Sequence, residues 1–503
     1  MGRQSIEFQN VTFAYETLSE PLINRLSLQF YPGWTGVIGV NGVGKSTLLK
    51  LSTGTLSASQ GQVFIPGNAL YCQQRTDSPP DRFSDFINAM DHDAFVLKGQ
   101  LLIEENWPSR WNSLSHGERK RAQIGTALWI QPAVLAIDEP TNHLDQLARS
   151  VLIKALQSFK GVGLLVSHDR ELLDTLCRYC LFLDPPEIFQ RPGNYSKVWK
   201  QIQQERESIQ KQHLQANSEY KKLEREVKKR RSEALQADKK RSKRGIDQKD
   251  HDAKSKINMA RLTGKDAVAS KLMNQLEGRR SQAQNRLNQI KVKKTYETGI
   301  WQQGEKSKKD LLFSIPHGIL SLGEGRQLSF PNLSMKPDDH VSLTGLNGTG
   351  KSTLLKHITE SITLPPDRMI CIPQEIDAEK SRLILQEVHQ LPGDKLGHMM
   401  TVINRLGTRP PRLLESSEPS PGEVRKIMLA IGVANIPHLI VMDEPTNHLD
   451  LLSIDCLQDT LKDYPAGLLL ISHDKRFLRE LTTINWHITE GDNGTNTLTI
   501  HQV

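Results

Sequence analysis

Long hydrophobic runs are missing from this sequence. Its longest apolar stretches, of the kind GLLLIS and HLIVM, are far shorter than the ~18–20 residues that a membrane-spanning helix needs. The first residues, MGRQSIEF, contain neither the apolar core of a signal peptide nor a myristoylation pattern, because position 6 is Ile rather than Ser or Thr. We therefore expect a cytoplasmic protein without a membrane segment.

Cysteine is also scarce. The 503 residues include 5 cysteines, and so small and odd a number argues against a disulfide framework and for a reducing compartment. Cys177 and Cys180 are spaced as CxxC, but no second pair completes a zinc site, so we interpret them as small buried apolar residues.

Neither sign of charge dominates the whole chain. Lys+Arg 65 and Asp+Glu 57 give a net charge of +8, which is weak evidence for a polyanionic partner. Charged residues at 24% and hydrophobic residues at 37% are typical of a globular protein, and the length suggests two to four domains. The distribution of the charge is therefore more informative than its total.

Three motifs occur twice, in the same order and at almost the same offset, so the chain contains two copies of one domain. The first and second occurrences are GVNGVGKSTLLK from Gly39 and GLNGTGKSTLLK from Gly345, IDEPTNHLD ending at Asp145 and MDEPTNHLD ending at Asp450, and SHD at Ser167 and Ser472.

The segment between the copies has a different composition. Residues 201–300 contain 26 Lys+Arg, 13 Asp+Glu and no Pro, which leaves 39 basic and 44 acidic residues in the rest of the chain. The segment is therefore +13 and the remainder −5. Apolar residues at helical spacing on both sides of a glycine-containing middle predict an antiparallel helical hairpin with arms of about forty residues, or roughly 60 Å. We expect domains at 1–195 and 306–503, joined by this basic linker at 196–305.

Each copy is predicted to be an α/β domain. WTGVIGV, AVLAI and GLLVSHD, and their counterparts in the second copy, are short apolar runs bounded by Gly, Pro or Asp. Such runs are typical of parallel strands buried on both faces with helices between them. A charged motif follows each run, which places the chemistry at the carboxyl ends of the strands.

The first repeated motif is a phosphate-binding loop. GxxxxGK[ST] is specific when a strand precedes it and a helix follows, because its glycines let backbone N–H groups surround phosphate oxygens. Lys45 and Lys351 would bridge the β- and γ-phosphates, and Ser46 and Ser352 would bind Mg²⁺. The predicted nucleotide-binding residues are Gly39, Asn41, Gly42, Gly44, Lys45, Ser46 and Thr47, with Gly345, Asn347, Gly348, Gly350, Lys351, Ser352 and Thr353.

Two adjacent carboxylates follow a later strand in each copy. Asp138 and Asp443 come first, and they suit the Mg²⁺ shell. Glu139 and Glu444 follow at once and suit a general base or a group that positions water. An Asp-Glu pair after a strand is commonly only a solvated loop, but the phosphate-binding loop upstream favours catalysis.

A histidine follows the next strand in each copy. His168 and His473 could sense the γ-phosphate, whereas the plainer interpretation is a structural histidine at a strand end. Their matched positions favour the functional interpretation.

LSHGE and PSPGE each precede a helical pattern. Ser-x-x-Glu is a capping box, and Pro421 would occupy the favoured first helical position. A capped helix start beside a glycine also offers N–H groups to an anion, so both roles are compatible. The candidate residues are Ser115, Gly117, Glu118, Ser420, Gly422 and Glu423.

Together these motifs resemble a pair of ATP-binding cassettes, with the Walker A, signature, Walker B and switch-histidine motifs in order. EPTNHLD in both copies, together with a charged helical linker, is similar to the ATP-binding cassette F family. The resemblance covers both copies, about four fifths of the chain, and implies two P-loop NTPase ATP-binding cassette domains joined by a long α-helical hairpin. Members of that family act on ribosomes, as translation factors or in resistance to ribosome-targeting antibiotics.

The resemblance implies further residues. Gln74 and Gln374 look like the Q-loop glutamines, which take part in catalysis and bind Mg²⁺. Tyr15 is placed like the aromatic residue that stacks on adenine, whereas Ser321 stands at the matching place in the second copy. Asp145 and Asp450 look like the D-loop aspartates.

The family mechanism implies two shared ATP sites. One would join residues 39–47, Gln74, Asp138, Glu139 and His168 to Ser420 and Gly422 of the other copy. The second would join residues 345–353, Gln374, Asp443, Glu444 and His473 to Ser115 and Gly117. ATP with Mg²⁺ would hold the copies together within one monomeric chain, and hydrolysis would release them. The basic hairpin would contact rRNA and tRNA of the ribosome, through phosphate contacts above all.

Two other functions remain open at this point. The chain could be the ATPase subunit of a transporter, although such fusions need only a short connection. It could also be an RNA-binding clamp that uses ATP only as a ligand, although Glu139 and Glu444 argue for hydrolysis.

Overall fold

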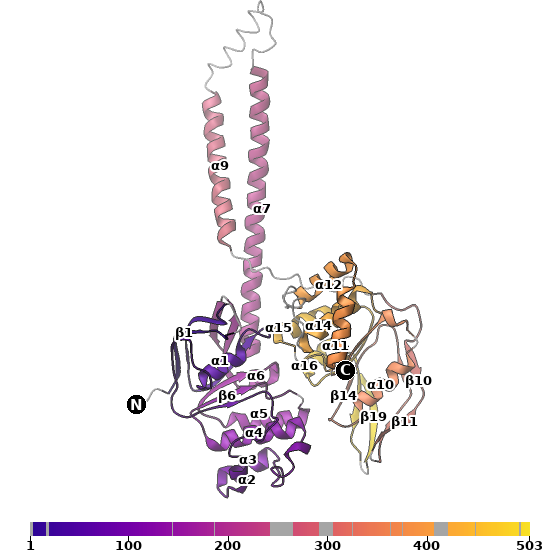
Figure 1. Ribbon diagram of the computed structural model, residues 1–503. Helices are drawn as coiled ribbons and strands as arrows, with labels where there is room; N and C mark the ends of the chain where they lie inside the picture. The colour runs from indigo at the N-terminus through magenta and orange to yellow at the C-terminus, as the bar shows by residue number, and fades with distance from the viewer. Residues whose placement is uncertain are drawn as a thin grey trace, which may run out of the picture. The chain divides into compact units, whose positions relative to one another are not determined.

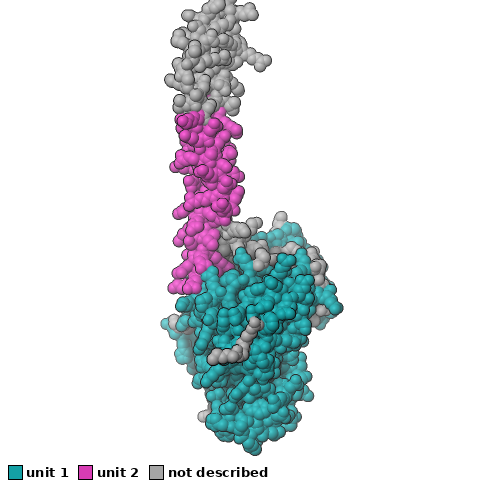
Figure 2. Space-filling model, turned by 90° about the vertical axis from the view of Figure 1, so that its left-hand side faces the viewer, with its two compact units in different colours: residues 1–198, 296–503 teal, residues 199–295 magenta. Residues whose placement is uncertain are grey.

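The computed structural model describes residues 4–16, 20–142, 144–185, 187–241, 265–290, 305–323, 325–362, 364–374, 376–406, 421–447, 449–491 and 494–502. Within it the chain forms two compact units, shown in different colours in Figure 2. The larger unit combines Met1–Val198 with Tyr296–Val503, and the smaller consists of Trp199–Thr295. The two stretches of the larger unit are called the first half and the second half below.

The first half contains a six-stranded sheet in the order β5-β6-β7-β3-β8-β9 and a three-stranded sheet in the order β2-β1-β4. Their strands are β1 (Ile6–Phe13), β2 (Ile23–Phe30), β3 (Gly33–Gly39), β4 (Gln60–Phe64), β5 (Ala69–Cys72), β6 (Val134–Asp138), β7 (Val162–Val166), β8 (Cys177–Asp184) and β9 (Glu187–Pro192). The helices are α1 (Lys45–Ser52), α2 (Phe83–Asn88), α3 (His92–Gln100), the 3₁₀ turn η1 (Trp111–Ser113), α4 (His116–Ile130), α5 (Gln146–Gln157) and α6 (Arg170–Leu176).

The second half contains an eight-stranded sheet in the order β11-β12-β19-β18-β14-β17-β16-β15 and a strand pair β10-β13. Their strands are β10 (Phe313–Ile315), β11 (Gly318–Gly323), β12 (Arg326–Phe330), β13 (Leu333–Met335), β14 (His340–Gly345), β15 (Met369–Ile372), β16 (Leu439–Asp443), β17 (Gly467–Ile471), β18 (Ile484–Thr489) and β19 (Thr495–Gln502). The helices are α10 (Lys351–Ser361), the 3₁₀ turn η2 (Pro366–Arg368), α11 (Ala378–His389), α12 (Gly393–Arg405), α14 (Pro421–Ala434), α15 (Leu451–Lys462) and α16 (Lys475–Leu481).

Five parallel strands correspond between the halves and confirm the predicted α/β sheet. They are β5, β6, β7, β3 and β8 in the first half and β15, β16, β17, β14 and β18 in the second. Every residue of β6, β7, β16 and β17 is buried, which explains their continuous apolar sequences. Asp138 pairs with Val166, and Asp443 pairs with Ile471, so the motifs that follow these strands meet at one sheet edge.

In both halves an apolar core lies between the sheets and the helix that follows the phosphate-binding loop. In the first half, strands β1 to β3 and β6 to β8 pack together with α1, where Leu48 and Leu49 are fully buried (Figure 1). In the second half, one apolar cluster lies between the sheet and α10, and another lies among α12, α14 and α15. The sheet edges that carry the motifs are therefore held by rigid, dry packing.

The smaller unit is a helical hairpin. Within the described residues, α7 (Tyr195–Arg241) has 47 residues and α9 (Lys265–Gln289) has 25, and the expected arm length of about forty stays a prediction because residues 242–264 are outside the described part. The two helices lie side by side (Figure 1), with Arg231 and Glu277 joined by an ion pair of 3.7 Å. The predicted break with Gly245 and Gly264 lies outside the described residues.

Only part of the predicted apolar stripe of the hairpin is buried. Val227 and Leu276 are buried, but Ile209 is 40% exposed and Leu272 is 41% exposed. A two-helix unit can cover only one narrow face of each helix, so some of the apolar residues at helical spacing stay exposed.

Two expectations based on absence can be compared with the structure. Among the described residues, none of the helices combines the length and the apolarity that a bilayer crossing requires. Cys177 and Cys180 are both buried and unpaired, as small apolar residues should be.

Candidate nucleotide sites

The two phosphate-binding loops have the same backbone geometry. Gly44 and Gly350 adopt φ values of 103° and 101° at the starts of α1 and α10, a left-handed region that glycine tolerates. The Nζ of Lys45 donates to the carbonyl oxygen of Gly39 at 2.8 Å and to Asn41 Oδ1 at 3.2 Å. Each loop is therefore curled around its own lysine.

The second lysine makes equivalent contacts. Lys351 Nζ donates to the carbonyl oxygens of Gly345 and Leu346, both at 2.8 Å. Burial lowers the pKa of Lys351 and of Lys45, while the carboxylates of each Asp-Glu pair act in the opposite direction. In each loop a partly desolvated cation beside the N–H groups of a helix start forms an environment that favours an anion.

Oxygen donors of the kind that Mg²⁺ prefers converge beside each loop. Ser352 Oγ donates to Asp443 Oδ2 at 3.0 Å, and Ser46 makes the same contact with Asp138. The phenol of Tyr71 also donates to Asp138 Oδ2, at 3.0 Å. Burial raises the pKa of both aspartates because it disfavours the ionised carboxylate. A cation bound beside each carboxylate would stabilise that ionised form. Hydroxyl and carboxylate oxygens in this arrangement fit a magnesium ion.

The neighbouring glutamates have strained backbones. Glu139 and Glu444 have φ values of 46° and 50°, which are uncommon outside glycine. The N–H of Glu139 donates to the carbonyl oxygen of Val166, and that of Glu444 to Ile471, both at 2.9 Å. Strain that is kept in both halves by a buried hydrogen bond is typical of functional sites, and here it fixes the direction of each side chain.

The switch histidines contact these glutamates. His168 Nε2 lies 3.0 Å from Glu139 Oε1, and His473 Nε2 lies 3.5 Å from Glu444 Oε1 and 3.2 Å from Asn347 Oδ1. The backbone N–H of each histidine also donates to the same glutamate, at 3.3 Å. The switch histidine, the glutamate and the phosphate-binding loop are thus contiguous.

The electrostatics of the two glutamates differ. Burial opposes ionisation of Glu139, but His168 and Lys45 outweigh it and hold the pKa below the ordinary value. For Glu444, burial raises the pKa to about 8, and the nearby Asp443 adds to the effect. The pKa of His473 falls to about 4 because of burial and the nearby Lys351.

Two buried cations beside the sites were not singled out from the sequence. Lys120 Nζ donates to the carbonyl oxygens of Gln73 at 2.7 Å and of Asp138 at 3.2 Å. Arg425, 305 residues later, contacts the carbonyl oxygens of Gln374 and Glu444. These side chains tie α4 and α14 to the strand ends. The shared offset of 305 was the signal that could have found them.

The first signature serine has the predicted cap geometry. Ser115 is the N-cap of α4: its Oγ accepts from the N–H of Glu118 at 3.2 Å, and Glu118 Oε2 accepts from the N–H of Ser115 at 2.7 Å. A Cβ on Gly117 would come 2.9 Å from Leu144, so the helix start packs closely against the D-loop. In the second half α14 begins at Pro421 with Gly422 and Glu423 in its first turn, whereas Ser420 lies outside the described residues.

A cavity of about 510 Å³ joins the two halves at the second phosphate-binding loop. It brings together the predicted signature residues of one half with the predicted loop, glutamine, carboxylate and histidine residues of the other, except that Gly345 does not line it. The lining residues are Ser115, His116, Gly117, Glu118, Arg121, Leu144, Asp145 and Ala148 of the first half, with Leu322, Asn347, Gly348, Gly350, Lys351, Ser352, Thr353, Gln374, Asp443, Glu444 and His473 of the second.

Residues of the second half also lie near the first phosphate-binding loop. The D-loop residue Asp450 caps α15 and lies 3.6 Å from Lys426 Nζ, and both are buried. Both also act electrostatically on Lys45. Asp145 acts on Lys351 in the same manner. Gln74 is exposed at the end of β5, beyond these contacts.

The two halves differ where an adenine ring would lie. The ring of Tyr15 packs edge-on against Phe13 with centroids 4.9 Å apart, and its hydroxyl lies 3.0 Å from Thr47 Oγ1. In the second half Ser321 is in β11, and Leu322 covers the loop so closely that a Cβ on Gly350 would be 2.7 Å from it. Leu22 lies over Gly44 of the first loop in a similar way, at 3.1 Å from such a Cβ, so the difference between the halves is the additional aromatic residue, Tyr15, at the first loop.

Comparison with known proteins agrees with this geometry. The profile of the ABC transporter family matches residues 23–142 and 328–447. The chain is 27% identical to the ribosome protection protein VmlR of Bacillus subtilis, over 95% of this chain and 86% of that protein. It is 28% identical to the ATP-binding cassette sub-family F member 2 of Bos taurus, over 78% of this chain and 60% of that protein. The chain is an ATP-binding cassette protein of the F family.

Other similarities follow the whole length of this F-family protein. The erythromycin resistance ATP-binding protein MsrA of Staphylococcus epidermidis is 27% identical, over 97% of this chain and 98% of that one. A solved structure of an RNase-L inhibitor has a TM-score of 0.61 at 17% identity and covers 97% of this chain and 90% of its own, which shows a shared fold. Cassettes of this family bind ATP, generally with Mg²⁺, and hydrolyse it, so the chain is an ATPase.

Proposed function

We propose that this ATPase acts on the ribosome, in translation or in resistance to ribosome-targeting antibiotics. The cavity shared by the two cassettes is the observation that carries the ATP-driven part of the proposal, because a nucleotide there would touch both cassettes at once. The names of the relatives support the ribosomal part: ribosome protection for VmlR, and translational throttle for EttA of Haemophilus influenzae, which is 24% identical.

Matching residues have the same proposed roles in the two ATP sites. Backbone N–H groups and the lysine of the phosphate-binding loop hold the phosphates, with Ser115, Gly117 and Glu118 completing the second site and Ser420, Gly422 and Glu423 the first. Ser46, Gln74 and Asp138, and likewise Ser352, Gln374 and Asp443, would hold Mg²⁺, which supplies charge neutralisation at the phosphates when it is bound.

Hydrolysis is assigned to the glutamate and histidine of each site. Glu139 and Glu444 accept a proton from the attacking water, and their fixed backbones aim the carboxylates. His168 and His473 orient these carboxylates and contact the γ-phosphate. Asp145 and Asp450 cap helices next to the phosphate-binding loop of the opposite cassette. They are the proposed residues through which one ATP site affects the other.

The basic hairpin is the proposed RNA-contacting part. Residues 201–300 carry +13, whereas the rest of the chain carries −5. We assign domains at 1–195, 196–305 and 306–503, in a monomeric cytoplasmic protein whose hairpin contacts rRNA and tRNA. Such contacts depend on neutralised phosphates, so they should weaken steeply as salt increases.

Sedimentation with ribosomes tests the proposal. The Glu139→Gln, Glu444→Gln double variant should bind ATP without turning it over and should pellet with 70S ribosomes in ATP but not in ADP. Replacing residues 230–270 by a short Gly-Ser turn should abolish pelleting while ATP binding persists. Arg110→Ala, which removes exposed contacts with Glu104 and Asn106, is the matched control. If the protein pellets with ribosomes to the same extent in ATP and ADP, and with or without residues 230–270, the proposed ribosomal role is refuted.

A further inference from the structure

One arginine of the first cassette is held between two acidic side chains. Arg149 lies in α5, one turn after the helix-capping Asp145. Its Nη2 contacts Asp169 and lies 3.2 Å from Glu171 Oε2, and only 12% of its side chain is exposed. A guanidinium is a planar fork of five donors, so two carboxylates fix its orientation closely.

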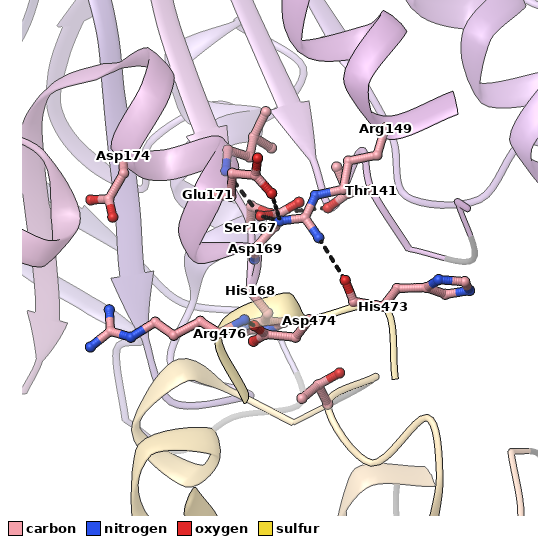
Figure 3. A network of polar contacts seen from close by, with 12 residues as sticks. Thr141, Arg149, Ser167, His168, Asp169, Glu171, Asp174, His473, Asp474 and Arg476 are labelled. Atoms are coloured by element: carbon pink, nitrogen blue, oxygen red, sulfur yellow. Dashed lines mark hydrogen bonds and ion pairs between the residues drawn. The ribbon is translucent and has the colours of Figure 1, made fainter. Parts of the chain in front are cut away.

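The same guanidinium reaches the second cassette. Arg149 Nη1 donates to the carbonyl oxygen of His473 at 3.3 Å, as Figure 3 shows. His473 belongs to the loop between β17 and α16, and its ring faces Asn347 and Glu444 at the second site. Arg149 thus contacts the backbone of the switch histidine without lining the cavity itself.

Among the residues that the structure describes, this contact has no counterpart in the opposite direction. Ile454 stands 305 residues after Arg149, at the matching position of α15, and it is buried in an apolar cluster. Arg476 matches Glu171, and it contacts Ser196 Oγ and Glu480 instead. At the position that matches Arg149, the second cassette therefore has an apolar residue, and within the described residues the two switch loops differ in their contacts with the opposite cassette.

We propose that Arg149 is a positioning residue for ATP hydrolysis at the second site. It holds the His473 carbonyl, and hence the imidazole and Glu444, in the reacting arrangement only while the two cassettes are paired. The inference rests on the proposed function, because it assumes that Glu444 and His473 take part in hydrolysis. It adds that turnover at this site depends on a residue of the other cassette outside the known motifs.

Loss of the Arg149 hydrogen bond would free the loop that carries His473, and this should raise the activation free energy of hydrolysis. A hydrogen bond from a charged donor is worth roughly 1.5–3 kcal/mol, which corresponds to about ten- to a hundredfold in rate if it is made in the reacting state alone. ATP binding uses the phosphate-binding loop and the signature residues, none of which Arg149 contacts. Its loss should therefore affect kcat far more than KM.

The test measures each site separately. Glu139→Gln leaves turnover to the second site, and Glu444→Gln leaves it to the first. In the Glu139→Gln background, Arg149→Met should lower kcat about tenfold with KM changed less than twofold. Arg149→Lys keeps the charge without the planar fork and should recover part of the loss. In the Glu444→Gln background the same changes should have little effect, and Arg110→Met should be neutral in both.

Three results would count against the inference. Equal losses in both backgrounds would indicate a general structural role, and an unchanged kcat in the Glu139→Gln background would remove Arg149 from the reaction. If Arg149→Met does not fold, the comparison rests on Arg149→Lys, for which about threefold is expected at the second site alone. If neither parent variant hydrolyses ATP, the proposed reaction itself fails, and the inference fails with it.

Discussion

The two cassettes repeat the same motifs in different surroundings. Glu139 lies 3.0 Å from its histidine and has a lowered pKa, whereas Glu444 lies 3.5 Å from its own and has a pKa raised to about 8. A leucine covers each phosphate-binding loop, Leu22 in the first cassette and Leu322 in the second, but Tyr15 adds an aromatic ring at the first loop, where Ser321 is the matching residue of the second cassette. The comparison teaches that the motif determines the kind of chemistry, while residues outside the motif make one site different from the other.

A small group of buried polar side chains also joins the two cassettes. Arg170 of the first cassette is paired with Asp455 of the second and donates to Gln458 Oε1 at 2.7 Å. The phenol of Tyr195, the first residue of α7, donates to Asp455 Oδ2 at 3.0 Å. These side chains are largely buried, so the pairing depends on a few charged contacts whose loss cannot be compensated by water.

The largest expected effect comes from removing both glutamates. Glu139→Gln with Glu444→Gln should lower steady-state turnover by ~10²–10⁴-fold, the magnitude of general-base catalysis, because an amide cannot accept the proton of water. Phosphate release measures this, and retained ATP binding is the control. The single variants then show whether the sites contribute unequally. Undiminished phosphate release by the double variant would exclude both residues from the reaction.

The interface pair should dominate stability. Asp455→Ala leaves Arg170 buried without its carboxylate partner, with Gln458 as its remaining neutral acceptor, and should reduce the free energy of unfolding by ~3–5 kcal/mol. Glu104→Ala breaks the exposed pair with Arg110 and should cost less than about 1 kcal/mol. Urea unfolding monitored by two probes measures both. Equal costs would mean that the buried pair contributes no more than a surface pair.

Removing the predicted adenine-stacking ring of Tyr15 should have a smaller effect, on ATP affinity. Tyr15→Ala removes a ring whose stacking on a base is worth ~1–3 kcal/mol, so ATP should bind about tenfold more weakly at the first site. Tyr15→Phe loses only the hydroxyl contact with Thr47 and should stay within about threefold. Titration of a fluorescent ATP analogue, with the second site disabled by Lys351→Ala, measures this. Equal affinities for Tyr15→Ala and the parent would mean that no stacking occurs.

The smallest effect is expected from giving the second site an aromatic residue. Leu322→Tyr should tighten ATP binding about threefold, since aromatic contacts add ~0.5–1.5 kcal/mol beyond the area that they bury. The same titration with Lys45→Ala in place of Lys351→Ala isolates this site. Weaker binding would mean that Leu322 is fitted to the loop and that the asymmetry is not a missing aromatic contact.

Much of the fold follows from local sequence. The apolar runs that end at Gly39, Asp138 and Val166 predict buried parallel strands, and their motifs meet because parallel strands end at one edge. The cap at Ser115 is likewise local, since Ser-x-x-Glu satisfies its own N–H groups.

Contacts between distant segments could not be predicted in this way. Arg149 and Lys120 lie on helix faces whose partners are loops far along the chain, and no short pattern identifies such partners. Sequence therefore identified the chemistry of each site better than the contacts that distinguish the sites.

The central claim, that each ATP site is shared by both cassettes, is tested most directly by Ser115→Arg. Ser115 belongs to the first cassette but lines the cavity of the second loop. Single-turnover hydrolysis of labelled ATP should fall at least tenfold in the Glu139→Gln background, where the second site alone is active, and should persist in the Glu444→Gln background. An unchanged rate in the first background, or loss only in the second, would contradict the shared site.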